Sequence, residues 1–486
     1  MMQGMRRQSN TAPRKTRPVR LLLIALVVFL AVSLPAAGMF AVDAALGKQY
    51  ADTYYAVLGT KYDRLRAVEG PKIVVVGGSA TAFGIDEALV EEETGMPCVA
   101  FGLYAAFGLK CMLDLSLNGI GKGDIVVVSP EFSSQMFSEY VGYDALLQAA
   151  ESRKGLLWAL GRSYFGGMMR SYPEYLVRKK EVADVGGVEG AGVYTKEAFD
   201  DQGRMIFVRE GNTMDRMVSE DNLPEIRAEI VTEAFLEMVN EYARRVRRRG
   251  AEVYFGFVPV NAKSVELAAD TDKEGFVSAL EAGLSFPLLS DLDQHILDER
   301  YFYDSNFHMN DTGMVYNTIL LVNDLKRVTG QQGAVKTHLP QPPEGAADAQ
   351  ILSSGDLNGL LYDVTAEGVV ITGLSDEAKA AEKIEVPEEI ENNLVRRIDA
   401  YAFANASART ITLPKSVTVL AGHLFENCTQ LTRVELLAEE LPQVGDTLTA
   451  GAPEGLVIAV PADAYGTYLT DYFWARYARV LARIGE

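Results

Sequence analysis

Short apolar runs alternate with helical patterns through the middle of the chain. The first run, Ile73–Val76, is β-branched throughout and stops at Gly77, Gly78 and Ser79. The later predicted strands are Cys98–Phe101, Ile125–Val128 and Val253–Val258, and the predicted helices are Asp86–Glu93, Leu109–Asn118 and Leu223–Arg249. Apolar strands separated by helices are typical of a parallel sheet that is buried on both faces. The pattern therefore predicts an α/β fold, a parallel sheet flanked by helices.

The amino-terminal end combines a basic segment with a long apolar run. Residues 1–20 hold six arginine and lysine residues and no acid, and a nearly unbroken apolar run of 22 residues follows at 21–42. This length is enough for a helix to cross a bilayer, and the basic flank favours a cytoplasmic start. We therefore expect a cytoplasmic segment at 1–20, a single-pass transmembrane signal anchor at 21–42 in the cell membrane, and an extracytoplasmic body. A cleaved signal peptide is the alternative, because small residues at 35–38 and 41–44 suit a cleavage site.

The net charge limits the classes of binding partner, and the cysteine content limits the disulfides and metal sites that the chain can form. The formal net charge is −20, so we expect no nucleic-acid partner. The three cysteines, Cys98, Cys111 and Cys428, fit neither a disulfide framework nor a zinc site by number and spacing. Pairing of Cys98 with Cys111 and free buried thiols remain as alternatives. We expect neither a cofactor nor a metal.

Changes in composition divide the body into parts. Residues 43–70 are expected to form a helical stalk, and 71–330 are expected to form the α/β domain. At about 131–222 the strand–helix rhythm is broken by an aromatic and glycine-rich insertion, which is either a lid over a site or a subdomain that only packs. Pro340, Pro342 and Pro343 mark a linker at 331–350, and a separate domain is expected at 351–486.

The carboxyl-terminal domain carries a repeated pattern. Phe403 and Phe425 are 22 residues apart, and Leu413 and Leu436 are 23 residues apart. Such periods are typical of leucine-rich repeats. The region from about 390 to 486 resembles the BspA-type leucine-rich repeat of bacterial surface proteins, with two clear repeats and a weaker candidate within 350–390. The resemblance implies a surface that binds a protein or glycan ligand.

Two segments far apart in the chain carry the candidate chemistry. Ser79 follows the first strand, so its side chain is expected at the carboxyl edge of the sheet, where ligands bind in open α/β folds. His308 comes more than 200 residues later, and Asp304 lies four residues before it. A serine hydroxyl becomes a nucleophile when a base removes its proton and a third group orients that base. The sequence therefore predicts a catalytic set of Ser79, His308 and Asp304.

These two segments resemble the SGNH (GDSL-like) hydrolase superfamily over about 71–330. The matching motifs are Val-Gly-Gly-Ser79, and Asp304 followed by His308-Met-Asn-x-x-Gly313. The resemblance implies a three-layer, flavodoxin-like fold with Ser79 as nucleophile and His308 as base. It also implies an oxyanion hole formed by the backbone N–H groups of Ser79 and Gly102. The chain looks most similar to the membrane-anchored branch that transfers acyl groups to surface polysaccharides and teichoic acids.

The chain departs from the family pattern at two places. The family's acid lies three residues before the histidine, where this chain has Ser305, and Asp304 is one residue further back. The family's Gly-x-Asn-Asp block, whose asparagine also lines the oxyanion hole, has no match, and the equivalent segment is Val128-Ser-Pro-Glu-Phe132. These departures leave a divergent or inactive member of the superfamily as an alternative.

Other motifs in the chain have structural explanations. The segment 77–79 fits neither of the glycine patterns that cradle phosphates. Asp311-Thr-Gly313 is the aspartic-protease triplet, but Asn310 or Asp311 as the cap of a helix that starts at Thr312 explains it better. Asp291-x-Asp-x-His295 contains metal-ligand residue types, and carboxylates at a helix start explain it better than a metal site.

Two functions follow as hypotheses. In the first, the protein is a membrane-anchored extracytoplasmic serine esterase or O-acyltransferase that acts on a cell-envelope polysaccharide or a teichoic-acid-like polymer. Transfer would also require a membrane acyl-donor protein, which is implied by the resemblance alone. In the second, the protein is a non-catalytic cell-surface protein, with a degenerate hydrolase scaffold and a ligand-binding repeat domain. The retained Ser79, Gly102 and His308 favour the first hypothesis, and the missing asparagine and the displaced Asp304 favour the second.

Overall fold

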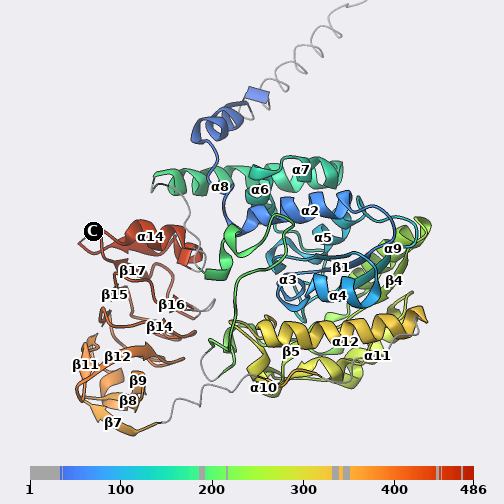
Figure 1. Ribbon diagram of the computed structural model, residues 1–486. Coiled ribbons are helices and arrows are strands. Elements are labelled where there is room, and N and C mark those ends of the chain that lie inside the picture. Colours follow the sequence, from blue (N-terminus) through green and yellow to red (C-terminus); the bar gives the residue numbers. More distant parts are fainter. Residues whose placement is uncertain are drawn as a thin grey trace, which may run out of the picture.

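The computed structural model contains an α/β domain and a carboxyl-terminal repeat domain (Figure 1). It describes residues 33–34, 37–184, 186, 192–214, 217–330, 339–342, 351–444, 448–449, 451–471 and 474–485. Within these residues, no helix has the length and apolar character needed to cross a membrane. The basic segment at 1–20, most of the expected anchor at 21–42 and most of the linker at 331–350 lie outside the described residues.

The α/β domain is built on four parallel strands in the order β2-β1-β3-β4. They are β1 (Ile73–Gly77), β2 (Cys98–Phe101), β3 (Ile125–Ser129) and β4 (Glu252–Phe255). The chain passes from β1 to β2 on one side and then crosses back to β3 on the other, so the strand order reverses at β1. In open parallel sheets, ligands bind beyond the carboxyl ends of the strands at such a reversal. The predicted parallel sheet is confirmed, and the reversal lies where β1 leads into Ser79.

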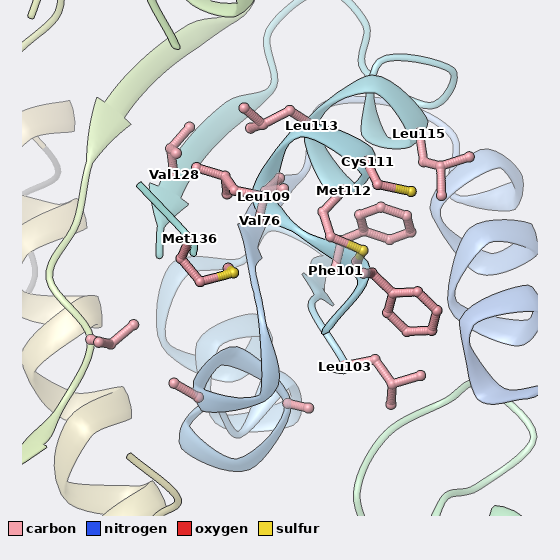
Figure 2. Close-up of a cluster of buried hydrophobic side chains, with 14 of the residues drawn as sticks. Val76, Phe101, Leu103, Leu109, Cys111, Met112, Leu113, Leu115, Val128 and Met136 are labelled. Atoms are coloured by element: carbon pink, nitrogen blue, oxygen red, sulfur yellow. The ribbon is translucent and has the colours of Figure 1, made fainter. Parts of the chain in front are cut away.

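Alternate residues of β1 contact two different layers of helices. One layer consists of α2 (Val57–Ala67), α5 (Leu109–Ser116) and α9 (Glu233–Arg248), and the other consists of α4 (Glu87–Thr94) and α12 (Asp311–Thr329). Val74 and Val76 are buried with the first layer, and Figure 2 shows Val76 beside side chains from α5. Ile73 and Val75 are buried with the second layer. Burial of both faces explains why the strands lack polar alternation.

The helix predicted at Leu223–Arg249 begins only at Glu233, as α9. The side chain of Thr232 caps it by accepting a hydrogen bond from the Phe235 N–H. Pro224 disfavours a helical conformation at Leu223, and the stretch from 224 to 232 is irregular apart from η8 (Ala228–Ile230). The prediction was wrong there because apolar spacing alone does not mark the start of a helix.

The segment 43–70 differs from the free-standing stalk that the sequence led us to expect. Tyr54 in η1 (Tyr54–Ala56) and Leu58 in α2 are buried in the core of the α/β domain. The Lys179 ammonium, on the long helix of the insertion, donates a hydrogen bond of 2.7 Å to Asp43 Oδ1. A helical stalk and a helix that covers a sheet have the same apolar spacing, so the sequence alone does not separate them.

The insertion at 131–222 consists of a layer of helices followed by a segment that returns to the α/β domain. Its helices are α6 (Tyr143–Ser152), α7 (Gly155–Leu160) and α8 (Phe165–Asp184). The segment from 192 onward then packs against the α/β domain, where Thr195 forms an isolated bridge with Thr53, just before η1. Val193 and Tyr194 are buried in the main core. The insertion therefore delivers side chains to the part of the domain where β1 ends.

The α/β domain contains further helices and strands. They are α3 (Ser79–Gly84), η2 (Ala105–Phe107), η3 (Arg162–Tyr164), η4 (Gly192–Tyr194), η5 (Lys196–Ala198), η7 (Glu220–Asn222), β5 (Val260–Asn261), α10 (Ala262–Leu267), α11 (Lys273–Gly283), η9 (Leu292–His295), β6 (Ile296–Leu297) and η10 (Glu299–Tyr301). The three cysteines are buried and free, so Cys98 and Cys111 are not paired.

The repeat domain stacks short strands into two sheets. The first sheet holds the parallel strands β10 (Lys383–Glu385), β13 (Thr410–Leu413), β15 (Arg433–Leu436), β17 (Val457–Val460) and β18 (Leu481–Arg483). The second holds β7 (Ser353–Leu357), β8 (Leu360–Thr365), β9 (Gly368–Leu374), β12 (Asn393–Ile398), β14 (Val419–Leu420) and β16 (Gln443–Val444), with β11 (Glu389–Ile390) beside β12. Helices α13 (Asp376–Lys379), α14 (Tyr465–Thr470) and η11 (Trp474–Tyr477) complete the domain.

Equivalent residues of successive repeats lie on top of one another. The rings of Phe403 and Phe425 stack with centroids 6.2 Å apart and planes 7° apart, which is the structural counterpart of their spacing in the sequence. The weak repeat expected within 350–390 has a different form at its start, since β7, β8 and β9 are antiparallel neighbours. This antiparallel meander covers one end of the array, and β9 then pairs in parallel with β12.

Candidate active site

Two glycines allow the carboxyl end of β1 to approach its neighbour β3 closely. A Cβ atom on Gly77 would lie 2.2 Å from the backbone oxygen of Ser129. A Cβ atom on Gly78 would lie 2.4 Å from both carboxylate oxygens of Glu131. Only glycine fits at these positions, and the tight turn delivers Ser79 as the first residue of α3. Ser79 is 8% exposed, so its hydroxyl lies in a largely water-excluded position.

The structure brings together the three side chains that the sequence singles out. His308 Nε2 lies 2.8 Å from Ser79 Oγ, and His308 Nδ1 lies 2.8 Å from Asp304 Oδ1. The imidazole thus bridges the hydroxyl and the carboxylate through its two different nitrogens, which is the geometry that general-base activation of a serine requires. His308 is also buried, at 7% exposure. The displacement of Asp304 by one position in the sequence does not prevent this contact.

A short hairpin-like segment holds His308 in place. Phe302 and Met309 form an antiparallel bridge, and the Tyr303 N–H donates to the His308 carbonyl at 2.8 Å. The side chain of Asn310 caps α12, which begins at Asp311. This cap is one of the two that the sequence offered, and it explains the Asp-Thr-Gly triplet.

Aromatic and cationic side chains support the imidazole from the other side. The ring of Phe83 stacks on that of His308, with centroids 3.9 Å apart and planes 14° apart. Arg209 is buried and donates hydrogen bonds of 3.0 Å to the carbonyl oxygens of Phe83 and Met309. One guanidinium therefore ties α3, which carries the serine, to the segment that carries the histidine.

Tyr194, from the insertion, is a fourth member of the constellation. Its hydroxyl donates a hydrogen bond of 2.7 Å to Asp304 Oδ2, the oxygen that does not contact His308. Burial, and then the negative charge of Asp304, raise the pKa of Tyr194 well above its ordinary value, so the phenol stays a donor. No motif in the sequence marks this residue as functional, because the insertion follows no recognisable pattern. Aromatic content was the only available clue.

Gly102 lies directly after β2 and against the turn that carries Ser79. A Cβ atom at this position would lie 2.4 Å from the Gly78 carbonyl oxygen and 2.6 Å from Thr81 Cβ. Glycine is therefore required for the close approach of the two segments. The structure places Gly102 beside the serine turn, where the resemblance implies a backbone donor to an oxyanion.

Glu131 is a second residue that the sequence did not single out as functional. Its Oε1 accepts a hydrogen bond of 2.8 Å from the Ala80 N–H and lies 3.4 Å from Ser79 Oγ. Its Oε2 is buried and has no hydrogen-bond partner among the described residues. Burial raises the pKa of Glu131 above its ordinary value, against the lowering effect of the Ala80 hydrogen bond. This carboxyl group belongs to the segment that stands where the family has its asparagine block.

The alternative metal motif does not assemble a site. Within the residues that the structure describes, no cluster of three or more His, Cys, Asp and Glu side chains could hold a metal ion. His295 Nε2 lies 2.7 Å from Ser290 Oγ, and Asp293 pairs with Lys273 at 2.6 Å. The motif instead forms η9, which begins after Asp291.

The comparison with known families assigns the repeat part of the chain. Residues 379–448 match the family model described as a BspA type leucine-rich repeat region, with six copies, where the sequence pattern alone shows two clear ones. The predicted BspA-type repeat is therefore confirmed for residues 379–448, and the stacked parallel strands agree with it. No curated protein and no solved structure matches the chain. The class that fold and site define is a parallel α/β domain with a serine–histidine–aspartate constellation, joined to leucine-rich repeats of the BspA type.

Proposed function

We propose that the α/β domain is an SGNH-type serine hydrolase, an esterase or O-acyltransferase. The observation that carries the proposal is the continuous chain of contacts from Ser79 through His308 to Asp304, at 2.8 Å for each step. Its position at the reversal of strand order, beyond the carboxyl end of β1, supports the same conclusion. A degenerate scaffold without catalytic activity would not require a buried hydroxyl, imidazole and carboxylate in hydrogen-bonding geometry.

The proposed reaction proceeds by acyl transfer through the serine. His308 Nε2 takes the proton of Ser79 Oγ as this oxygen attacks the carbonyl carbon of an ester. Asp304 holds the imidazole in the tautomer with the proton on Nδ1 and stabilises the imidazolium that forms. The backbone N–H groups of Ser79 and Gly102 would donate to the oxyanion. The alcohol leaves with the proton from His308, and an acyl-enzyme remains.

The second half of the reaction decides between hydrolysis and transfer. Water or the hydroxyl of an acceptor gives its proton to His308 Nε2, attacks the acyl-enzyme and restores Ser79. The proposed acceptor is a cell-envelope polysaccharide or a teichoic-acid-like polymer, with a membrane protein as acyl donor in the case of transfer. The basic segment and apolar run at 1–42 support a location at the cell membrane with the body outside. Substrate and location rest on the sequence and on the resemblance.

The test of this function is turnover of an ester by the full-length chain. We expect hydrolysis of p-nitrophenyl acetate, and trapping of an acetyl group on Ser79 that mass spectrometry detects. Ser79→Ala and His308→Ala should each abolish turnover. Ser116→Ala is the matched control, because Ser116 is also buried and its hydroxyl lies 2.7 Å from Tyr242 Oη, away from the site. Retained turnover in Ser79→Ala, or equal loss in the control, would overturn the proposal.

We propose in addition that the repeat domain binds a polar ligand. Buried residues alternate with outward-facing polar ones along β10, β13 and β15. The register places Lys383, Thr410 and Arg433 in one row across these strands. Such a mixed polar face suits a glycan or a protein ligand. Sedimentation of the full chain with purified cell walls tests this role, and binding that is unchanged in the double variant Lys383→Glu, Arg433→Glu would contradict it.

A further inference from the structure

The chain passes from the apolar run at 21–42 directly onto the helical layer of the insertion. The ring of Phe40 lies against that of Tyr172 in α8, with centroids 5.2 Å apart. Asp43 Oδ1, one residue after the run, accepts a hydrogen bond of 2.7 Å from the ammonium of Lys179, also in α8. Lys179 is 1% exposed, so its side chain lies within the packed layer. The end of the apolar run is therefore fixed against α8 rather than joined to the domain by a free linker.

This contact sets the level of the helical layer relative to a membrane. In the proposed location the run at 21–42 crosses the bilayer, and Phe40 lies two residues before its end, about 3 Å along a helix. A helix in contact with Phe40 is therefore at the surface of the bilayer. Figure 1 shows α6, α7 and α8 together on the side of the domain from which the described residues 37–46 rise, with α10 and α12 on the opposite side. The helical layer of the insertion therefore faces the lipid.

Two aromatic side chains of this layer are exposed. Trp158 in α7 is 86% exposed, and Phe165 at the start of α8 is 62% exposed. Leu156 and Leu160 of α7 are buried, so Trp158 points away from the core of the domain. A large ring in water lacks the stabilisation that burial of apolar surface provides, whereas tryptophan is enriched where a membrane meets water. The two exposed rings therefore fit a lipid surface.

The charge of the same segment is opposite to that of the chain as a whole. Residues 152–173 contain four basic residues and no acid, in a chain with a formal net charge of −20. Three of the four, Lys154, Arg162 and Arg170, are exposed. Anionic lipids attract cations near the membrane surface and repel an acidic body. The charge therefore favours contact of this face, rather than of another, with an anionic membrane.

We propose that α7 and the first turns of α8 lie on the outer surface of the membrane and bind anionic phospholipid headgroups. Trp158 and Phe165 enter the headgroup region. The lipid phosphates are contacted by Lys154, Arg162 and Arg170. This inference goes beyond the proposed chemistry and rests on the proposed location at the membrane. The contact holds the α/β domain in one orientation on the bilayer.

The experiment uses the fluorescence of the two tryptophans of the chain, Trp158 and Trp474. Trp474 is 1% exposed in the core of the repeat domain, so it serves as an internal control. The full-length protein is reconstituted into vesicles of phosphatidylcholine and phosphatidylglycerol whose acyl chains carry bromine near the headgroup, and bromine quenches an indole that touches the lipid. We expect the wild type to lose about half of its emission, because one of its two indoles lies at the interface. Trp158→Phe should lose none.

A matched variant tests whether the contact is confined to this face. Leu267 is a 49% exposed side chain of α10, on the opposite side of the domain in Figure 1. Leu267→Trp, made in the Trp158→Phe background, places an exposed indole there and should not be quenched.

Each other outcome identifies the part of the account that is wrong. An unquenched wild type on vesicles that carry the protein, or equal quenching in the Leu267→Trp variant, would overturn the docking of α7 and α8. Equal quenching in vesicles of phosphatidylcholine alone would overturn the binding of anionic headgroups. A protein that does not float with the vesicles in a density gradient would overturn the membrane location, and with it this inference. The proposed chemistry is tested separately, by ester turnover.

Discussion

The hydrogen bond from Tyr194 to Asp304 offers a quantitative test of how the insertion contributes to the site. In Tyr194→Phe the ring remains, including its edge contact with Tyr54 at a centroid distance of 5.5 Å, and only the hydroxyl is removed. Asp304 Oδ2 then loses a donor at 2.7 Å while Oδ1 still contacts His308. A hydrogen bond to a charged group contributes about 1.5–3 kcal/mol, and about 1.4 kcal/mol corresponds to a factor of ten in rate. If the bond acts mainly when the imidazolium forms, kcat/KM should fall about 10- to 100-fold.

The assay is the steady-state hydrolysis of p-nitrophenyl acetate by the full-length chain. Tyr164→Phe is the matched control, because the Tyr164 hydroxyl also donates a 2.7 Å hydrogen bond to a carboxylate, Asp114, outside the candidate site. We expect the control to keep kcat/KM within about twofold of wild type. A loss of less than twofold in Tyr194→Phe, or the same loss in both variants, would refute the idea that the insertion orients Asp304 for catalysis.

Three further predictions concern stability, each measured by urea or thermal unfolding. Gly102→Ala should destabilise the protein by about 1–3 kcal/mol, because the added Cβ would lie 2.4 Å from the Gly78 carbonyl oxygen. Gly121→Ala is the control and should not destabilise the protein, because the added Cβ would have no atom within 4 Å. Burial lowers the pKa of His295 from 6.5 to about 4, so between pH 4 and pH 6.5 the unfolded state binds more protons than the folded state. The free energy of unfolding should therefore fall by about 3 kcal/mol from pH 6.5 to pH 4, and His295→Gln should remove this fall. Burial also lowers the pKa of Lys61 from 10.5 to about 7, so its contribution should make wild-type stability rise between pH 7 and pH 10. Lys61→Met should lack that rise and should be more stable than wild type at pH 7, by up to about 5 kcal/mol. If the pH dependence of stability is the same in His295→Gln or in Lys61→Met as in wild type, the argument from burial of that residue is contradicted.

The parts of the fold that could be predicted are those that depend on short-range pattern. The strands at Ile73–Val76 and Ile125–Val128 are continuous β-branched runs, and the structure has them within one residue. Their parallel arrangement follows from the helices between them. The start of α9 and the role of 43–70 could not be predicted in this way, because both depend on which surface an apolar face meets. That information is not local to the segment.

The residues of the candidate site fall into the same two groups: those that a local sequence pattern marks, and those that only tertiary packing brings to the site. Ser79 and His308 could be singled out because one follows a strand and a glycine turn, and the other precedes a capped helix. The position of Asp304, four residues before His308 in the chain, points to it as the orienting carboxylate, and the structure places the two in contact. Tyr194 and Glu131 could not be identified as functional, since each reaches the site from a segment whose own sequence lacks a motif. Their contacts with Asp304 and Ser79 arise from tertiary packing alone.

The central claim is that Ser79 is an activated nucleophile, and covalent labelling tests it most directly. Full-length wild type and Ser79→Ala would be treated with diisopropyl fluorophosphate, and the modified residue would be located by peptide mass spectrometry. The account predicts one phosphorylated serine, Ser79, with no labelling in Ser79→Ala and with labelling at least 100-fold slower in His308→Ala. Circular dichroism would confirm that each protein is folded. An unlabelled, folded wild type, or a label on another serine that persists in Ser79→Ala, would contradict the account.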